Sequence, residues 1–244
     1  MGKLHRFHIY ETEVTDNRLY IHDKELLKYA RKVLRQKRGD KIELFDGGGG
    51  KYVGTIEKLT NELLVVFVTE QVILKPKQDR KIILAQALPK AGKIDLILKF
   101  NTEIGVSEFV LFESDYSIVK AKHYSENKMF RLNKILKESA RQSLNAFIPS
   151  VLDPMKFSKM LDVEADVKLI FHTSIEEKKQ TLSSVKSSLK KDESVLVCVG
   201  PEGGFSTDEI KLAKSKGFQI ISLNLPVMRT ETAGLVITSY LLID

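Results

Sequence analysis

The sequence predicts an α/β domain with a mainly parallel sheet over residues 81–244, preceded by a small β-barrel over residues 1–72. The first observation is that the pattern of predicted secondary structure changes along the chain. The first part is β-rich with one helix, whereas strands and helices alternate after residue 80. The second is that the later strands are apolar throughout, as in 195–199, which is typical of parallel strands covered on both faces. The third is length, since 244 residues suffice for one large or two small domains.

The N-terminal part contains one helical pattern among short strands. Apolar residues recur with helical spacing between Leu26 and Leu34, which predicts a helix over residues 23–36 that ends before Gly39. The glycine-rich segment 46–50 predicts the turn of a hairpin. Strands are predicted over residues 41–45, 51–56 and 63–69.

A polar stretch with one proline, residues 73–80, is the predicted linker between the two parts. After it, strands are predicted over residues 81–85, 108–112, 167–172, 195–199 and 218–223. Helices are predicted over residues 91–104, 125–144, 181–189, 207–216 and 232–242. Parallel sheets bind ligands at the carboxyl ends of their strands, so the loops that follow residues 199 and 223 are the places to look for chemistry.

Composition narrows the class of protein. The chain contains 39 Lys and Arg residues and 32 Asp and Glu residues. The excess of basic residues is concentrated in residues 73–150, which contain 14 basic and 8 acidic residues. A local basic surface favours a polyanion such as RNA, although solvated helix faces often look the same. One cysteine excludes a disulfide framework and a cysteine-rich zinc module. The absence of an apolar leader or a membrane-length apolar run predicts a cytoplasmic protein that needs no membrane.

The first candidate site is the glycine-rich turn of residues 200–205 after the Cys198 strand. Glycines there allow the backbone to approach a ligand and expose its N–H groups. Glu202 would repel phosphate, so a cationic or hydroxyl-bearing ligand fits better than a nucleotide. Taken alone, the turn is equally compatible with a purely structural role, and the capping box of Ser206 and Glu209 explains how the next helix begins.

The second candidate site is the loop of residues 224–233. Thr230 or Thr232 is expected to cap the C-terminal helix, and Glu231 lies favourably near the positive helix end. Arg229 is a cation at that same positive end, where the helix dipole disfavours it, so an anionic partner is expected: Glu231, a nucleic-acid phosphate or a ligand carboxylate. The scattered histidines lack further ligands at metal-binding spacing, so no metal is predicted.

Several motifs in order resemble the RsmE family of SPOUT-class RNA methyltransferases. Residues 200–205 followed by 228–233 resemble its C-terminal signature, and residues 99–106 with 138–143 resemble its central motifs. The segments 5–7, 33–35, 39–40 and 44–47 resemble its start and its PUA-like RNA-binding barrel. The resemblance covers nearly the whole chain. Asn224 stands where the family usually has glycine and Pro226 where a basic residue is common.

The resemblance implies a fold and a reaction. The C-terminal domain is expected to carry a deep trefoil knot, and the protein is expected to be a homodimer. Its expected activity is methylation of N3 of the uridine at position 1498 of 16S ribosomal RNA in the small subunit, with S-adenosylmethionine as the cofactor. Residues expected to bind the cofactor are His172, Gly200, Pro201, Glu202, Gly203, Gly204, Leu223, Asn224, Val227, Met228, Thr230, Thr232 and Ala233.

Arg229 and Glu231 are the expected catalytic residues. Arg229 would stabilise the uridine anion or hold the target phosphate, Glu231 would orient Arg229 or accept the N3 proton, and Glu202 could balance the sulfonium charge. Residues expected to contact RNA are Arg6, Arg31, Lys32, Arg35, Lys90, Lys93, Lys99 and Arg141. Two alternatives stay open: a SPOUT enzyme that methylates a ribose 2′-hydroxyl in tRNA or rRNA, and a non-catalytic RNA-binding protein of ribosome assembly.

Overall fold

A computed structural model of the chain describes residues 4–76, 80–90, 92–173, 181–223 and 225–243. By its contacts the chain forms two compact units. The first consists of residues 1–77 and 140–148, and the second of residues 78–139 and 149–244. The segment 140–148 therefore belongs with the N-terminal sheet, although it lies inside the stretch 81–244 that was predicted as one domain.

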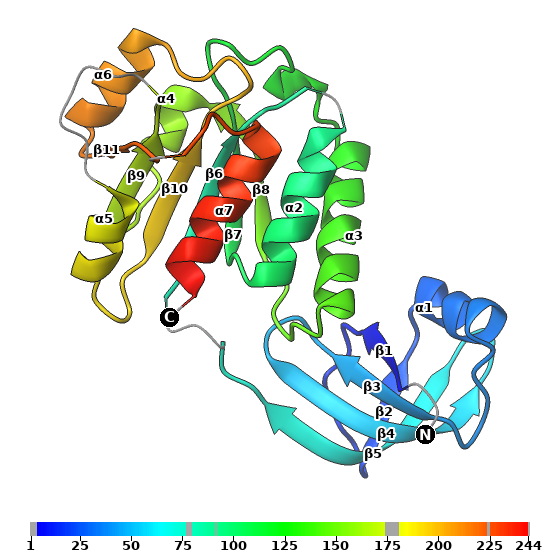
Figure 1. The fold of residues 1–244 in the computed structure, drawn as a ribbon. Coiled ribbons are helices and arrows are strands. Elements are labelled where there is room, and N and C mark those ends of the chain that lie inside the picture. The colour runs from blue at the N-terminus through cyan, green and yellow to red at the C-terminus, as the bar shows by residue number, and fades with distance from the viewer. Residues whose placement is uncertain (1–3, 77–79, 91, 174–180, 224, 244) are drawn as a thin grey trace. The chain divides into compact units, whose positions relative to one another are not determined.

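The first unit is a five-stranded sheet with one short helical segment (Figure 1). Its elements are β1 (His5–His8), β2 (Arg18–Ile21), α1 (Lys24–Lys28), β3 (Lys41–Phe45), β4 (Gly50–Leu59) and β5 (Leu64–Ile73). The strand order is β1-β3-β4-β5-β2, with β1 and β3 parallel and the other pairs antiparallel. Alternate residues of the strands, such as Leu19, Ile21, Ile42 and Leu44, are buried in one core.

The helix predicted over residues 23–36 is shorter and less regular than expected. Asp23 caps α1 by accepting a hydrogen bond from the amide of Leu26, and a π-helical turn continues over Tyr29–Val33. In that turn the amide of Leu34 reaches the carbonyl of Tyr29. Arg35 then adopts a φ of 54°, a left-handed conformation that ends the helix. Apolar spacing predicted the helix but not this early end.

Arg6, which we expected to contact RNA, lies inside the first unit instead. Its side chain is 5% exposed and its Nε lies 2.8 Å from the Glu43 carboxylate. Its two terminal nitrogens donate to the carbonyls of Ala140 (3.2 Å) and Asn145 (3.1 Å). Because the guanidinium is used to attach segment 140–148 to β1, it is not available to RNA in this arrangement.

The second unit is a six-stranded sheet in the order β11-β9-β10-β6-β7-β8, and every neighbouring pair is parallel. Its strands are β6 (Ile82–Ala87), β7 (Glu108–Glu113), β8 (Ser150–Lys156), β9 (Val167–Phe171), β10 (Val195–Val199) and β11 (Gln219–Ile221). Its helices are α2 (Lys93–Ile104), α3 (Glu126–Gln142), α4 (Phe157–Met160), α5 (Leu182–Ser188), α6 (Thr207–Ser215) and α7 (Thr230–Leu242). A 3₁₀ turn at Ala121–His123 precedes α3. The parallel sheet is as predicted.

Helices cover both faces of this sheet (Figure 1). On β6, Ile83, Ala85 and Ala87 pack into a core that also contains residues of α4 and α6. The alternate residues of β6, Leu84 and Gln86, face Gly234 of α7. Helix α2 lies beside α7, and the buried hydroxyl of Thr238 donates to the Asn101 side chain between them (2.7 Å). No helix among the described ranges has the length and apolar character needed to cross a membrane.

Strand β8 and the start of helix α7 differ from the predictions for physical reasons. Strand β8 was not predicted because it contains Pro154 and few apolar residues, and it is an edge strand, the place where a sheet tolerates proline. Helix α7 begins at Thr230, two residues before the predicted start. Its N-cap residue is Arg229, which makes no side-chain capping bond, so the expected threonine cap is wrong.

Candidate functional site

A cavity of about 410 Å³ lies in the second unit at the carboxyl ends of three adjacent strands. Strand β9 ends at Phe171, β10 at Val199 and β11 at Ile221, and all three residues line it. The loops that follow these strands and the first turns of α7 complete the wall. This is the position at which parallel sheets bind ligands, and the volume is in the range of small-molecule sites.

Both loops singled out in the sequence line this one cavity. The predicted cofactor-binding residues found in its wall are His172, Gly200, Pro201, Glu202, Gly203, Gly204, Leu223, Val227, Met228, Thr230 and Ala233. Thr232 is exposed and is not part of the lining. Asn224 lies outside the described residues. Lys93, which was predicted to contact RNA, also lines the cavity.

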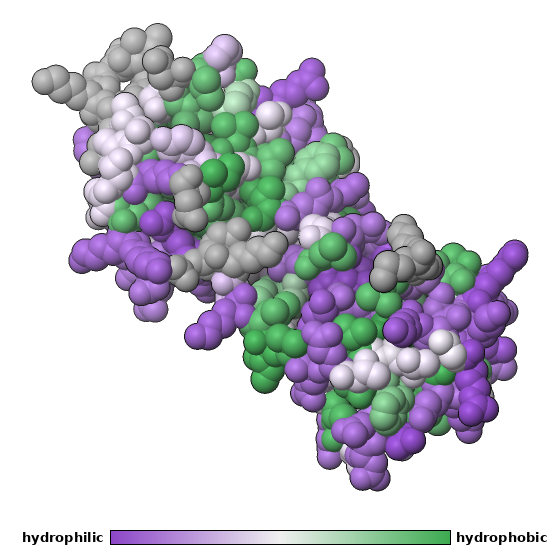
Figure 2. All heavy atoms as spheres, turned by 60° about the horizontal axis from the view of Figure 1, so that its bottom comes forward, coloured by the Kyte–Doolittle hydropathy of each residue, from purple (hydrophilic) through white to green (hydrophobic). Residues whose placement is uncertain are grey.

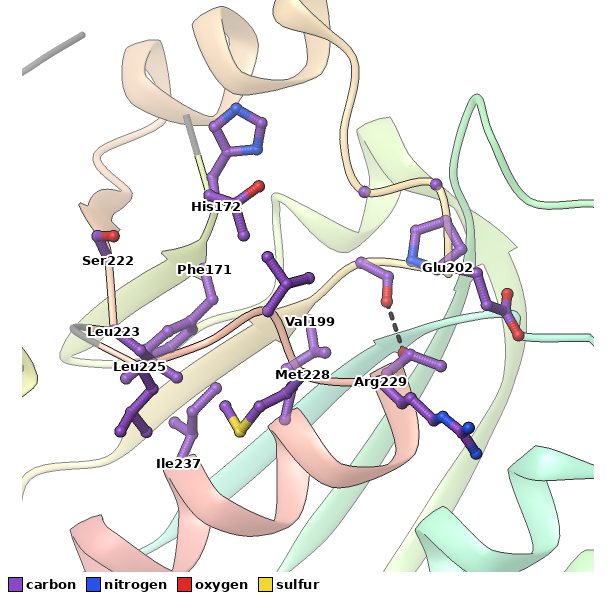
Figure 3. Close-up of a pocket in the computed structure, with 18 of the residues that line it drawn as sticks. Phe171, His172, Val199, Glu202, Ser222, Leu223, Leu225, Met228, Arg229 and Ile237 are labelled. Carbon is purple, nitrogen blue, oxygen red and sulfur yellow. Dashed lines mark hydrogen bonds between the residues drawn. The ribbon is translucent and has the colours of Figure 1, made fainter. Parts of the chain in front are cut away.

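The cavity has an apolar end and a charged end. Figure 3 shows Leu223, Leu225 and Ile237 on one side and Glu202 and Arg229 on the other. Sequence reasoning missed a set of lining residues at or just after the strand ends and in α7: Phe171, Thr173, Val199, Ile221, Ser222 and Ile237. The position of the strand ends was a usable signal for most of them, whereas Ile237 lies two turns into α7.

The glycine turn is packed too tightly for larger residues. A Cβ on Gly200 would lie 3.1 Å from the Phe205 ring, and one on Gly203 would lie 3.0 Å from Cβ of Tyr116. Gly204 has a φ of 71°, and its amide donates to the carbonyl of Pro201 (3.0 Å). Since no side chains intervene at these positions, the backbone of the turn faces the cavity directly.

A buried hydrogen-bond link holds the two loops together. The Thr230 hydroxyl donates to the Gly200 carbonyl (2.7 Å), and the Gln86 side-chain amide donates to the Thr230 oxygen (2.9 Å). Gln86 is fully buried at the end of β6, and its amide nitrogen also lies 3.4 Å from the Gly200 carbonyl. Thr230 therefore connects the start of α7 to the glycine turn instead of capping its helix. Gln86 was not predicted as part of the site.

A charged cluster lies beside this link. The Lys93 ammonium pairs with Glu202 (2.9 Å) and with Glu231 (3.2 Å), and all three side chains are half-buried. The hydrogen bond to Glu202 is the main cause of a raised pKa at Lys93; burial opposes it and Glu231 adds to it. Burial acts to raise the pKa of Glu202, but the hydrogen bonds from Lys93 and from backbone amides outweigh it and lower the pKa.

Arg229 is exposed, and its side chain makes no hydrogen bond or ion pair with any residue that the structure describes. Glu231 pairs with Lys93, so the expected orientation of Arg229 by Glu231 is wrong for this arrangement. Arg229 still lines the cavity at its charged end. A guanidinium with no partner among the described residues, beside a ligand-sized cavity, is available to an anionic group that enters from outside.

The remaining predicted RNA contacts lie in several settings. Lys32 and Arg35 of the first unit are exposed, as are Lys90 and Lys99 of the second. Arg31 donates to the Asn61 side chain, and Arg141 lies 5.8 Å from the Tyr29 ring. Hydrophilic side chains cover much of the face drawn in Figure 2. In the described ranges, no group of three or more His, Cys, Asp or Glu is placed to hold a metal ion.

The chain matches two family models. Residues 76–242 match an RNA methyltransferase domain, and residues 23–69 match the PUA domain of RNA methyltransferases. A ribosomal RNA small subunit methyltransferase E of Synechocystis is 30% identical over 213 residues, which cover 85% of this chain and 67% of that protein. The protein of the same name from Bacillus subtilis is 29% identical over 208 residues, 83% of this chain and 81% of that protein.

Two solved structures share the fold over nearly the whole chain. A putative methyltransferase of Legionella pneumophila, solved in complex with S-adenosylmethionine, is 25% identical with a TM-score of 0.86 and coverage of 98% of this chain and 97% of that one. A probable rRNA-methyltransferase of Porphyromonas gingivalis is 28% identical with a TM-score of 0.82 and coverage of 98% of both chains. Together with the family models, these likenesses show that the chain belongs to the RsmE family of SPOUT-class RNA methyltransferases, which carry a PUA domain.

Proposed function

We propose that this protein uses S-adenosylmethionine to methylate ribosomal RNA of the small subunit, at N3 of the uridine at position 1498. The observation that carries the proposal is the cavity at the ends of β9, β10 and β11, because it joins both signature loops in one ligand-sized site. The names of the relatives support the RNA substrate, and the Legionella structure supports the cofactor.

The residues of the cavity fit S-adenosylmethionine. Leu223, Leu225 and Ile237 form an apolar end that suits the adenine ring, and the exposed backbone of the glycine turn suits its polar edges and the amino-acid part. Glu202 places a carboxylate at the charged end, where a sulfonium gains from a negative neighbour. When bound there, S-adenosylmethionine supplies an electrophilic methyl group.

The protein's part in the reaction is to prepare the uridine. The N3–H is a weakly acidic imide that must lose its proton before N3 can attack a methyl group, and the base must leave its stack to reach the cavity. Arg229, exposed at the charged end, stabilises the resulting anion on the base or holds the target phosphate. Glu231 accepts the N3 proton, directly or through water. Holding both reactants in line supplies much of the remaining rate.

Wider features follow from the same proposal. RNA contacts are assigned to Arg31, Lys32, Arg35, Lys90, Lys99 and Arg141, while Arg6 is left out because it is buried and Lys93 because it is paired with two carboxylates. The trefoil knot, the homodimer and the cytoplasmic location are further expectations of the family.

Cofactor binding and methyl transfer test the proposal together. We expect calorimetry to show binding of S-adenosylmethionine, and we expect label from its methyl group to appear in small subunits that lack the modification. tRNA offered in parallel should stay unlabelled. Label in tRNA would favour the 2′-O-methyltransferase alternative. A protein that neither binds the cofactor nor transfers label would favour the RNA-binding scaffold and contradict the proposal.

A further inference from the structure

We propose that Lys93 is a positioning residue, whose ammonium holds the glycine turn and the start of α7 together and so keeps the cofactor cavity in its binding arrangement. This inference rests on the proposed function and deepens it. Its basis is that one cation joins two carboxylates: Glu202 of the glycine turn, which lines the cavity, and Glu231 in the first turn of α7, beside the lining residue Thr230.

The cation is placed where the fold alone disfavours it. Lys93 is the first residue of α2, at the positive end of the helix, and the residue before it, Gly92, is its N-cap with a φ of 87°. The carboxylates of Glu202 and Glu231 offset that cost, because both lie within hydrogen-bonding distance of the ammonium. Its raised pKa is consistent with a fully charged side chain at neutral pH.

The two carboxylates need this cation. Since the paired oxygens of Glu202 and Glu231 lie 2.9 Å and 3.2 Å from the same nitrogen, they are no more than about 6 Å apart. Without Lys93, two half-buried negative charges would face each other between the glycine turn and the first turn of α7. Repulsion between them would separate the glycine turn from α7.

The Lys93 contacts form the outer of two links between the glycine turn and α7. Beneath them, Thr230 donates to the Gly200 carbonyl and Gln86 donates to Thr230. The outer link also includes the loop before α2, because the Lys90 amide donates to Glu202 (3.2 Å). The inner link, through Thr230, joins the backbone of the glycine turn to α7. The outer link, through Lys93, neutralises the repulsion between the carboxylates of Glu202 and Glu231.

The test is the affinity for S-adenosylmethionine, measured by calorimetry in a cycle of variants. We expect Lys93→Met to weaken binding about tenfold, as when the competent arrangement is populated about a tenth of the time. Lys93→Arg should restore most of the affinity, because it keeps the charge. In a Glu231→Gln background, where one carboxylate is already neutral, Lys93→Met should weaken binding by no more than about threefold.

Lys81→Met is the matched control. Lys81 forms a comparable ion pair with Glu108 (2.8 Å), but at the amino ends of β6 and β7, away from the cavity. It should leave the affinity unchanged. Equal affinity of Lys93→Met and the wild type would overturn the inference, and so would an equal loss in both backgrounds, since a lysine that only contacts the cofactor or the fold would not depend on Glu231. If the wild-type protein bound no S-adenosylmethionine, the proposed function would fail first and this inference with it.

Discussion

At the scale of single residues, the stability of the second unit is expected to depend on the hydroxyl of Thr230. The residue is 5% exposed, and its hydroxyl donates to the Gly200 carbonyl and accepts from Gln86. Thr230→Val keeps the shape but removes the donor to the Gly200 carbonyl and an acceptor for the Gln86 amide in the interior. We expect the free energy of unfolding of the second unit to fall by about 1–3 kcal/mol, measured by hydrogen exchange of amides in β6 and β10.

Thr232→Val, at an exposed position two residues further along α7, is the control and should change that free energy by less than about 0.5 kcal/mol. Equal stability of the two variants would show that the buried link contributes nothing.

Arg229, unlike Thr230, is exposed, and its side chain makes no hydrogen bond or ion pair with the described part of the protein. Arg229→Ala should leave the stability and the affinity for S-adenosylmethionine unchanged while lowering the methyl-transfer rate about 100- to 1000-fold. Single-turnover transfer to small subunits measures the rate. Lys211→Ala, on the exposed side of α6, is the matched removal of a cation and should transfer at the wild-type rate. Full activity of Arg229→Ala would remove it from the mechanism.

Residue roles were only partly predictable from the sequence. Glycine turns and an unexplained arginine are local signals, and both were found at the cavity. The partners of Glu231 and Arg6 were not, because Lys93 and residues 140–145 lie far away along the chain. Gln86 was missed for the same reason, because the sequence of an apolar strand does not show which distant groups a glutamine side chain in it will hydrogen-bond.

At the scale of elements, α6 depends on a capping box that the sequence correctly predicts. The Glu209 carboxylate accepts from the Ser206 amide (3.0 Å) and also from the Ser114 hydroxyl (3.1 Å) and the Asp115 amide (3.0 Å). We expect Ser206→Ala to cost about 1 kcal/mol of unfolding free energy and Glu209→Ala about 2–4 kcal/mol, because it leaves three donors unpaired.

Denaturant unfolding monitored in α6 checks this, with Asp208→Ala as the control, because Asp208 is exposed in the same helical turn. A Glu209→Ala variant as stable as Asp208→Ala would mean that the carboxylate does not hold the loop after β7.

Elements with strong periodicity were predicted best. Strand β10 has the bounds predicted for it, 195–199, because an unbroken apolar run between a serine and a Gly-Pro pair leaves little choice of ends. The start of α7 was predicted two residues late, because Thr230 resembles a cap by composition while its hydroxyl is used by Gly200. The π-helical turn at Tyr29–Val33 has the same apolar spacing as an α-helix over so short a length, so spacing could not distinguish them.

At the scale of the whole molecule, we expect the two units to have separable roles. Arg6 is buried and connects four groups of the first unit, so Arg6→Met should destabilise that unit by about 3–5 kcal/mol. Hydrogen exchange in β3 and β4 measures the loss. The affinity for S-adenosylmethionine should stay unchanged, because the cavity is built entirely from the second unit.

Arg18→Met is the control, since Arg18 pairs with Glu57 in the same unit (2.7 Å) but is about one-third exposed, where solvent screening leaves an ion pair with little effect on stability. If Arg6→Met weakened cofactor binding as much as it destabilised the first unit, the roles of the units would not be separable.

Nucleoside mass spectrometry tests the central claim most directly. 16S ribosomal RNA from small subunits that lack the modification is incubated with the protein and S-adenosylmethionine, digested and analysed for methylated nucleosides. We expect one 3-methyluridine, formed only when the cofactor is present. A 2′-O-methyl nucleoside in its place would contradict the assigned target atom, and an unmethylated RNA after incubation with a protein that binds the cofactor would contradict the assigned substrate.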